Sequence, residues 1–264
     1  MSDTGRIVAV TGASSGIGLA AARLFRDRGD KVYCLSRTDP KEPGITFIHT
    51  DVTDEASVNA AFGAIGKAEG RIDVLLSNAG MGVSGAAEST TMQDAKRQLD
   101  VNFFGLHACV RAAVPLMRAH GGTILATSSV AAVFAIPFQA FYSASKFAVN
   151  ALVLALANEL KPFNIRVAAI MPGDVKTGFT GARVKAARDD NYGQSVEKSV
   201  AVMERDEQNG MGPEMIAKKF VALSLKKHPK VLSTVGLQYK FFCFLGKVLP
   251  IRLQNFIVGK MYIK

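Results

Sequence analysis

Three side chains in the middle of the chain could together move a proton. Tyr142 follows Ser129 by thirteen residues, and Lys146 follows the tyrosine by four. Residues i and i+4 share one face of a helix, so a helix here would bring the lysine ammonium beside the phenol. A nearby cation favours the phenolate and lowers a pKa that is about 10 in an ordinary tyrosine. Such a phenol can give or take a proton near neutral pH. Ser128 is the alternative to Ser129, and the thirteen-residue interval favours Ser129.

A glycine-rich turn near the N-terminus is typical of a pyrophosphate site. It follows an apolar run and leads directly into a helical pattern. Glycines allow the tight turn and a close approach of the ligand, and the helix N-terminus offers N–H groups and a positive dipole end. The same turn can occur without a ligand, so it gains its meaning from the rest of the chain. The candidate cofactor-binding residues here are Gly12, Ser14, Ser15, Gly16, Ile17 and Gly18.

These residues need a scaffold, and the periodicity predicts an α/β fold. Short apolar or β-branched runs alternate with longer helical patterns, which is typical of a parallel sheet with crossover helices. We expect a single Rossmann-type domain over residues 1–264: a doubly wound parallel sheet of six or seven strands with helices on both faces. The expected strands are 6–10, 31–36, 45–50, 74–77, 122–127 and 165–171, with a short one at 231–234. The expected helices are 16–28, 54–68, 91–119, 142–160 and 213–226.

With the glycine turn, the serine and the Tyr142-Ser-Ala-Ser-Lys146 segment in this order, the sequence resembles the short-chain dehydrogenase/reductase family. The resemblance extends from about residue 6 to about residue 226. It implies hydride transfer at a ketone or secondary alcohol. By resemblance, Ser129 binds the substrate carbonyl oxygen, Tyr142 donates the proton to it, and Lys146 holds the ribose hydroxyls. Asn102 matches an asparagine that holds a water against the lysine.

The resemblance also implies further contacts to the cofactor. Asp51 looks like the acceptor for the adenine amino group, and the segment from Asn78 to Gly80 matches one that braces the sheet and passes the ribose. The loop after the 165–171 strand matches one that contacts the nicotinamide carboxamide. The implied set is Asp51, Val52, Asn78, Ala79, Gly80, Pro172, Gly173, Val175 and Thr177, together with Tyr142 and Lys146.

The end of the second strand indicates which nicotinamide cofactor is used. Folds that prefer NAD place an acidic residue there to accept from the ribose 2′-OH. This chain has Ser36-Arg37-Thr38, and an arginine fork with a serine hydroxyl suits a 2′-phosphate. The alternative is that Arg37 is solvated and Asp39 turns inward to serve NAD. We expect NADP(H), bound through Ser36 and Arg37 with help from Ser14.

The charge of the chain is concentrated at its C-terminal end. Lys and Arg number 32 against 22 Asp and Glu, but ten of the basic residues follow Glu214, after which no acid occurs. The neutral main part and the lack of a nucleic-acid motif argue against nucleic acid as partner. Three scattered cysteines, without a CxxC or ligand-spaced histidines, predict no metal site and a reducing compartment. With no signal peptide and no long apolar run, we expect a cytoplasmic protein without a spanning helix.

Residues 174–212 interrupt the sheet pattern where α/β folds bind ligands, and they resemble the family's mobile substrate flap. We interpret the dense charges of this flap, among them Arg183 and Glu207, as a solvated helix face. Residues 130–138 are mostly apolar, and Val83 and Phe179 could extend that surface. These residues favour an apolar pocket for a small hydrophobic ketone or alcohol, although buried neighbours of the sheet would have the same composition.

The tail, residues 237–264, alternates apolar clusters with single cations. It looks more like the endings of steroid, retinoid or other lipid-ketone reductases than the short ending of bacterial ketoacyl reductases. Apolar side chains could enter an anionic membrane surface while the cations face its headgroups. The alternatives are a contact to another subunit or to the pocket, and a disordered tail. The cations are Lys240, Lys247, Arg252, Lys260 and Lys264.

Together these features predict an NADP(H)-dependent oxidoreductase that interconverts a steroid-like or lipid-like ketone and a secondary alcohol. A non-catalytic NADP-binding sensor or scaffold is the alternative, and the intact Ser129, Tyr142 and Lys146 argue against it. By resemblance, we expect a homodimer or homotetramer formed through helices 91–119 and 142–160.

Overall fold

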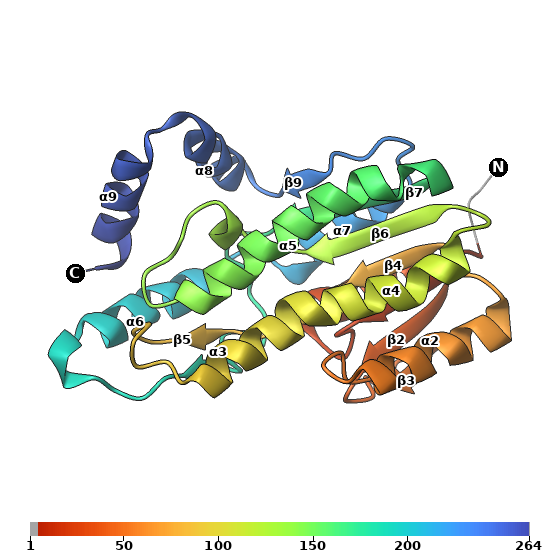
Figure 1. The fold of residues 1–264 in the computed structure, drawn as a ribbon, viewed down its shortest axis with the longest axis horizontal. Coiled ribbons are helices and arrows are strands. Elements are labelled where there is room, and N and C mark those ends of the chain that lie inside the picture. The colour runs from red at the N-terminus through yellow and green to blue at the C-terminus, as the bar shows by residue number, and fades with distance from the viewer. Residues whose placement is uncertain (1–4, 264) are drawn as a thin grey trace.

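A computed structural model describes residues 5–263 and contains one parallel sheet of seven strands (Figure 1). The strand order is β3-β2-β1-β4-β6-β7-β9. The predicted strands agree with the observed ones to within one residue at each end, and the predicted fold class is confirmed. The strands of this sheet are β1 (Ile7–Thr11), β2 (Lys31–Ser36), β3 (Ile45–His49), β4 (Val74–Ser77), β6 (Gly122–Thr127), β7 (Ile165–Met171) and β9 (Leu232–Thr234).

Both faces of the sheet are covered, which explains why its strands read as apolar runs rather than as alternating patterns. Every residue of β1 is buried. Ile7 and Ala9 join the core on one face, whereas Val8 and Val10 join the core on the other. Successive side chains of a strand point to opposite faces, so one continuous apolar run supplies both cores.

The helices divide between the two faces. Helices α2, α4 and α5 pack on one core, and α1 and α7 pack on the other (Figure 1). From β1 the chain adds β2 and β3 on one side, and it then returns to add β4 on the other side of β1. The order in which strands are added therefore changes direction at β1, and this is the switch point where α/β sheets bind ligands. The helices are α1 (Gly16–Asp27), α2 (Glu55–Glu69), α4 (Gly105–Met117), α5 (Ala140–Glu159) and α7 (Pro213–Ser224).

The helix predicted over residues 91–119 is not uniform. It consists of α3 (Met92–Leu99), a π-helical turn (Asp100–Phe104) and α4. A π-turn inside an α-helix often marks a functional site. Here it carries Asn102, one of the candidate catalytic residues.

Several elements were not predicted from the sequence, and they gather at the carboxyl ends of the strands. A second, two-stranded sheet pairs β5 (Val83–Ser84) with β8 (Val184–Lys185). Helix α6 (Ser195–Gln208) follows in the flap. The tail forms α8 (Leu237–Val248) and α9 (Ile251–Tyr262), which stand at one end of the molecule beyond β9 (Figure 1). The alternative of a disordered tail is therefore wrong for the described residues up to 263.

Helix α5 is long and apolar enough to cross a membrane by length and composition, with a mean hydropathy of 1.4, which our sequence criterion of an uninterrupted apolar run did not detect. In the fold it packs against β7, and Val149 and Val153 lie in the core. It also carries Tyr142 and Lys146. Its place on the sheet accounts for the apolar residues of its buried face, whereas Phe147 and Leu154 of the same helix are exposed.

Candidate active site

A cavity of about 780 Å³ opens at the carboxyl ends of the strands. This volume falls within the range of ligand and cofactor sites. The structure brings nearly all of the candidate residues to this one cavity, and the two exceptions are Gly18 and Asn102. The candidates that line it are Gly12, Ser14, Ser15, Gly16, Ile17, Ser36, Arg37, Asp51, Val52, Asn78, Ala79, Gly80, Ser129, Tyr142, Lys146, Pro172, Gly173, Val175 and Thr177.

The glycine turn is shaped for close approach. Gly12 and Gly16 have φ of +62° and +54°, a region that side chains disfavour. A Cβ on Gly12 would lie 2.8 Å from the Cα of Ala79, and one on Gly18 would lie 2.4 Å from the carbonyl oxygen of Gly12. Gly18 therefore lies beneath the turn and allows it to form. Ser15 begins α1 without a side-chain cap, so the first N–H groups of the helix suit a phosphate.

Asp51 and Asn78, both near the glycine turn, make different hydrogen bonds. The Asp51 carboxylate accepts hydrogen bonds from the backbone N–H and hydroxyl of Thr53. Burial raises the pKa of Asp51, but the Thr53 bonds outweigh it and hold the pKa below its usual value. Asn78 donates to the carbonyl oxygens of Thr11 and Gly12 and accepts from Thr127, so it ties β1, β4 and β6 together. The site therefore fits a dinucleotide cofactor, with the ionised Asp51 carboxylate as a hydrogen-bond acceptor at one side.

The end of β2 presents Arg37 to the cavity. Arg37 is exposed and lines the cavity, whereas Asp39 is exposed, does not line it, and accepts a hydrogen bond from the backbone N–H of Lys41. The hydroxyl of Ser36 donates to the carbonyl oxygen of Thr38, so it fixes the loop that carries the arginine. The cation, and not the carboxylate, lies at the cavity.

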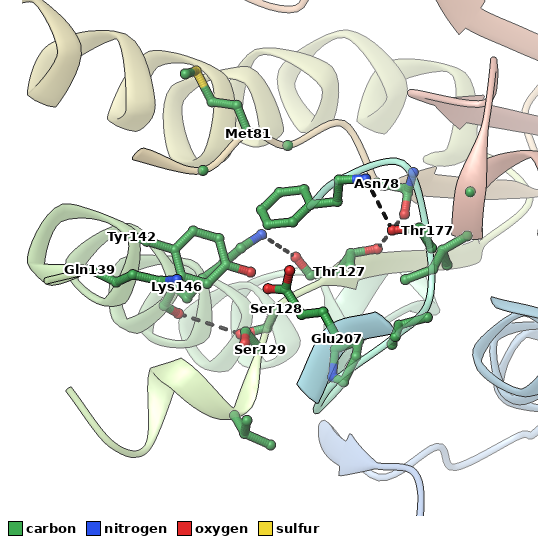
Figure 2. A pocket seen from close by; sticks show the side chains of 18 of the residues that line it. Asn78, Met81, Thr127, Ser128, Ser129, Gln139, Tyr142, Lys146, Thr177 and Glu207 are labelled. Atoms are coloured by element: carbon green, nitrogen blue, oxygen red, sulfur yellow. Dashed lines mark hydrogen bonds between the residues drawn. The ribbon is translucent and has the colours of Figure 1, made fainter. Parts of the chain in front are cut away.

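Ser129, Tyr142 and Lys146 converge in the cavity from the end of β6 and the first turns of α5 (Figure 2). The Ser129 side chain lies near the Tyr142 phenol and acts to lower its pKa, and the Ser129 hydroxyl accepts a hydrogen bond from the backbone N–H of Ala131. Lys146 is 4% exposed, and its Nζ lies 2.8 Å from the carbonyl oxygen of Thr127 and 5.7 Å from the centre of the Tyr142 ring. The hydroxyl of Ser128 instead points to the backbone carbonyl of Lys146, 3.5 Å away. This geometry favours Ser129 over Ser128 as the partner of the tyrosine.

The pKa of Tyr142 differs from the value expected from the sequence. Burial raises the pKa of Tyr142 to about 12, against the lowering effect of the Ser129 side chain. Burial also lowers the pKa of Lys146 to about 8. The expectation that the lysine makes the phenol acidic near neutral pH is not met in this arrangement, because burial is the largest effect on the phenol and raises its pKa. A phenol that keeps its proton is suited to act as an acid.

Asn102 is buried and hydrogen-bonded within the protein. Its side chain is 3% exposed, accepts from the backbone N–H of Met81, and donates to the Met81 carbonyl and the Ser145 hydroxyl. The amide is thus fully used within the protein and fixes the loop after β4 to α5. A Cβ on Gly80 would lie 3.4 Å from the Asn102 Oδ1 and 3.8 Å from the Lys146 Nζ. The asparagine thus positions the neighbourhood of the lysine, and the role of Asn102 in holding a water stays a prediction.

Three carboxylates that the sequence analysis treated as part of a solvated flap line the cavity near Tyr142: Asp174, Asp206 and Glu207. Glu207 raises the pKa of Tyr142 by its charge, and Figure 2 shows it reaching into the same cavity. It forms an ion pair with Arg183, whose side chain is only 1% exposed. The assignment of Arg183 and Glu207 to a solvated face is therefore wrong. The sequence contained an indication that Glu207 faces inward, because Val200, Met203 and Glu207 are spaced along one face of a helix. In the structure Val200 and Met203 are buried on that face of α6.

The C-terminal helices close the substrate side of the cavity. The phenol of Tyr239 donates to the Asp174 carboxylate over 2.7 Å. Burial raises the pKa of Asp174, and it raises the pKa of Tyr262 to about 12. The tail therefore contacts the pocket, which is one of the alternatives that the sequence left open. The tail residues that line the cavity are Gln238, Tyr239, Phe242, Leu245, Leu249, Gln254, Ile257, Val258, Met261 and Tyr262.

Comparison with known proteins gives the family. Residues 6–188 match the short chain dehydrogenase family. The chain belongs to the short-chain dehydrogenase/reductase family. It is 39% identical over 236 residues to a 3-ketodihydrosphingosine reductase of Bacteroides thetaiotaomicron, covering 88% of each chain. It is 38% identical to 17-beta-hydroxysteroid dehydrogenase type 1 of Mus musculus, over 66% of this chain and 55% of that protein.

The fold agrees with that assignment. A short-chain dehydrogenase from Streptomyces avermitilis superposes with a TM-score of 0.86 at 27% identity and covers 98% of each chain. Dehydrogenases of this family are oxidoreductases that use a nicotinamide cofactor, NAD in some structures and an NADP derivative in others. The glycine cradle, the uncapped start of α1 and Asp51 fit such a cofactor.

The family match ends before α6, so it covers the nucleotide side of the cavity and stops short of much of the substrate side. Glu207 on α6, Tyr239 on α8 and Tyr262 on α9 all lie outside it. Membership in the short-chain dehydrogenase/reductase family therefore accounts for the reaction type, and the substrate must be argued from this chain's own residues. Among the described residues, no group of three His, Cys, Asp or Glu side chains could hold a metal ion.

Proposed function

We propose that the protein is an NADP(H)-dependent reductase that converts a hydrophobic, lipid-like ketone into a secondary alcohol. One observation carries the proposal: Ser129, Tyr142 and Lys146 converge in the same cavity as the glycine turn and the tail helices. A scaffold that only bound the cofactor would not need a buried phenol beside a serine and a lysine in the same cavity.

Tyr142 is the proton donor in this proposal. With its pKa raised to about 12, it carries its proton at neutral pH and can deliver it to a developing alkoxide. The Ser129 hydroxyl holds the carbonyl oxygen within reach of the phenol. The nicotinamide supplies the hydride when the cofactor is bound. A protonated donor favours reduction at neutral pH, and oxidation of the alcohol needs a higher pH.

The cofactor is NADP(H), recognised by Arg37. A 2′-phosphate gains charge-assisted hydrogen bonds from a planar guanidinium, and a carboxylate at the same place would repel it. The placement of Asp39 outside the cavity supports this choice. Lys146 holds the ribose, and the loop with Pro172, Gly173, Val175 and Thr177 holds the nicotinamide. The contact of Gly16 with Thr177 supports that placement, because a Cβ on the glycine would lie 3.4 Å from the threonine side chain.

The substrate is a long-chain ketone with a polar, preferably cationic, group near the carbonyl. Glu207 and Asp174 lie close enough to Tyr142 to raise the pKa of its phenol, against the opposite effect of Arg183. Asp206 and apolar residues of the tail line the same cavity. A cation beside the ketone would meet the carboxylates, while an alkyl chain would lie along α8 and α9. The similar reductase of Bacteroides thetaiotaomicron is named for 3-ketodihydrosphingosine, a long-chain amino ketone. The charges favour this substrate over a steroid, which carries no cation.

The whole chain acts as one unit in this proposal, with residues 174–212 as the substrate flap and a homodimer or homotetramer as the assembly. Exposed apolar side chains on the helices expected to pair, among them Met92, Phe104, Phe147 and Leu154, support an oligomer. A cytoplasmic location is supported by the cysteines, which are free and buried within the described residues.

The test follows NADPH absorbance and product formation with purified protein and a panel of ketones. The panel contains 3-ketodihydrosphingosine, its N-acetyl derivative, a 17-ketosteroid and a short-chain ketone, each with NADPH and NADH. We expect kcat/KM to be highest for the long-chain amino ketone with NADPH, and at least about tenfold lower after acetylation removes its charge. If the protein binds NADPH but converts none of the ketones, the proposed enzyme function is wrong and the alternative of a non-catalytic sensor is favoured. Equal rates with the charged and acetylated forms would remove the carboxylates from recognition.

A further inference from the structure

The outer surface of α8 and α9 is the largest concentration of exposed apolar side chains on the molecule. Of the seventeen large apolar side chains exposed among the described residues, ten lie between Leu237 and Ile263. Soluble proteins rarely expose such a patch without a partner. The ten are Leu237, Phe241, Phe244, Val248, Ile251, Leu253, Phe256, Ile257, Met261 and Ile263, of which Ile257 and Met261 also line the cavity, so the other eight belong to the outer surface.

Each of these helices has two faces with different tasks. On α8, Tyr239 and Phe242 line the cavity, while Leu237, Phe241 and Phe244 are exposed at helical spacing. On α9, Gln254 and Val258 are buried on the inner side, while Phe256 is 62% exposed. The inner faces close the cavity, so the outer apolar surface is not explained by packing within the chain.

The charged side chains on the two tail helices themselves have one sign. The exposed cations of α8 and α9 are Lys240, Lys247, Arg252 and Lys260, and no acidic residue occurs after Glu214. Lys219 of α7 has a lowered pKa because of its burial and the charges of Lys226, Lys240 and Lys230, so the cations of α7 and α8 lie close together. A second copy docked through this face on a two-fold axis would bring the same cations against each other.

We propose that the outer face of α8 and α9, the tail surface, docks on an anionic lipid bilayer. The aromatic and aliphatic side chains enter the interface between headgroups and acyl chains, and the four cations contact the anionic headgroups. Because the inner faces of these helices line the cavity, the docked protein presents its substrate side to the membrane. A lipid-like ketone can then pass from the bilayer to Tyr142 between two helices and without crossing bulk water.

The test is co-sedimentation of the full-length protein with vesicles, and it does not depend on the proposed reaction. Vesicles of phosphatidylcholine alone are compared with vesicles that contain roughly 30% phosphatidylglycerol, at low and high salt. We expect binding to the anionic vesicles at low salt, weaker binding at high salt, and little binding to the neutral vesicles.

Two variants and a matched control separate this surface from general basicity. The first replaces the four cations of the tail surface with glutamine. The second carries Phe241→Ser, Phe244→Ser and Phe256→Ser. The control replaces four exposed lysines elsewhere with glutamine, and thus makes the same change in net charge: Lys67, Lys96, Lys161 and Lys198.

We expect the first variant to lose at least about 100-fold in partition coefficient on anionic vesicles, the second to lose at least about tenfold, and the control to change less than about threefold. Wild-type protein that ignores anionic vesicles at low salt would overturn the proposal, as would equal losses in the control. If the wild-type protein ignores vesicles and the variants dissociate an oligomer seen by light scattering, a second copy covers the face instead. Salt-dependent binding of the unaltered protein keeps the proposal testable even if a variant fails to fold.

Discussion

The cavity joins two ends that are built in different ways. At the nucleotide end, backbone atoms and glycines form the surface, and a single added carbon on Gly12 or Gly18 would collide with the neighbouring backbone. At the substrate end, the surface comes from long side chains of α6, α8 and α9, such as Glu207, Tyr239 and Tyr262. The first end is fixed by close backbone contacts, whereas the second can be changed by exchanging side chains without rebuilding the sheet.

The same division appears in the charges. The nucleotide end offers helix N–H groups and Arg37 to an anion, whereas the substrate end carries three carboxylates, of which Glu207 pairs with Arg183 and Asp174 accepts a hydrogen bond from Tyr239. Lys146 and Tyr142 lie where the two ends meet. Changes at one end should therefore alter cofactor use, changes at the other should alter substrate use, and changes at the junction should alter both.

The largest of the effects on the two ends is expected at the junction, from Lys146→Ala. This change removes the cation that would hold the ribose and a hydrogen bond to Thr127 beside Tyr142, the proposed proton donor. We expect turnover to fall by roughly 10²–10³-fold and the Kd for NADPH to rise at least about tenfold. NADPH fluorescence titration and single-turnover kinetics measure the two effects separately. If turnover is lost while the Kd for NADPH is unchanged, Lys146 acts on the substrate side only and does not hold the cofactor.

Arg37→Asp should act on the nucleotide end alone. Loss of the guanidinium and repulsion between the new carboxylate and the 2′-phosphate should lower the ratio of kcat/KM for NADPH over NADH by at least about tenfold, equivalent to roughly 1.4 kcal/mol. Asp39→Asn is the matched control on the same loop and should leave the ratio within about twofold. A ratio that responds to Asp39→Asn and not to Arg37→Asp would mean that the cofactor is NAD.

The pH dependence of cofactor use should report Lys146. Its pKa is lowered to about 8, so the ammonium is present below pH 8 and is lost as the pH rises above it. We expect kcat/KM for NADPH, which reports the free enzyme, to fall by up to about tenfold per pH unit above pH 8. The Lys146→Ala variant should lack this decline. A decline that persists in the variant would assign it to another group.

Gly246→Ala should disturb the substrate end and leave the nucleotide end intact. A Cβ at Gly246 would lie 2.4 Å from the Cγ1 of Val133 and 3.0 Å from the Phe134 ring, so α8 must shift outward. We expect kcat/KM for a long-chain ketone to fall by about three- to fivefold, with the Kd for NADPH unchanged. Gly259→Ala is the control, because its Cβ would meet no atom within 4 Å. Equal effects of the two changes would show that α8 does not shape the pocket.

The nucleotide end could be predicted almost completely from the sequence. Buried parallel strands are continuous apolar runs, and the glycine turn and the Tyr142-to-Lys146 spacing are local patterns. The π-turn at Asn102 could not be predicted from local spacing, and the side chain that it carries makes its hydrogen bonds to Met81 and Ser145, which are distant in the sequence. The pKa of Tyr142 was predicted in the wrong direction because a sequence shows the spacing of a cation but not the burial of a phenol.

The substrate end was harder for a related reason. Glu207 lies on an otherwise charged helix, and only its spacing from Val200 and Met203 indicates that it faces inward. The tail carries cations among its apolar residues and a proline between α8 and α9, so its helices were not predicted. Its inner and outer faces are distinguishable only when the cavity beneath them is known.

The most direct test of the proposed reaction is a single-turnover measurement with Tyr142→Phe. The change removes the hydroxyl and keeps the ring, which lies 5.8 Å from the Phe179 ring between centroids. NADPH oxidation by a long-chain amino ketone is followed in the wild type and the variant, with NADPH affinity measured in parallel. The proposed mechanism predicts a rate at least about 100-fold lower in the variant, with the Kd for NADPH within about threefold of the wild type. A rate above about a tenth of the wild type, with the same alcohol as product, would contradict it.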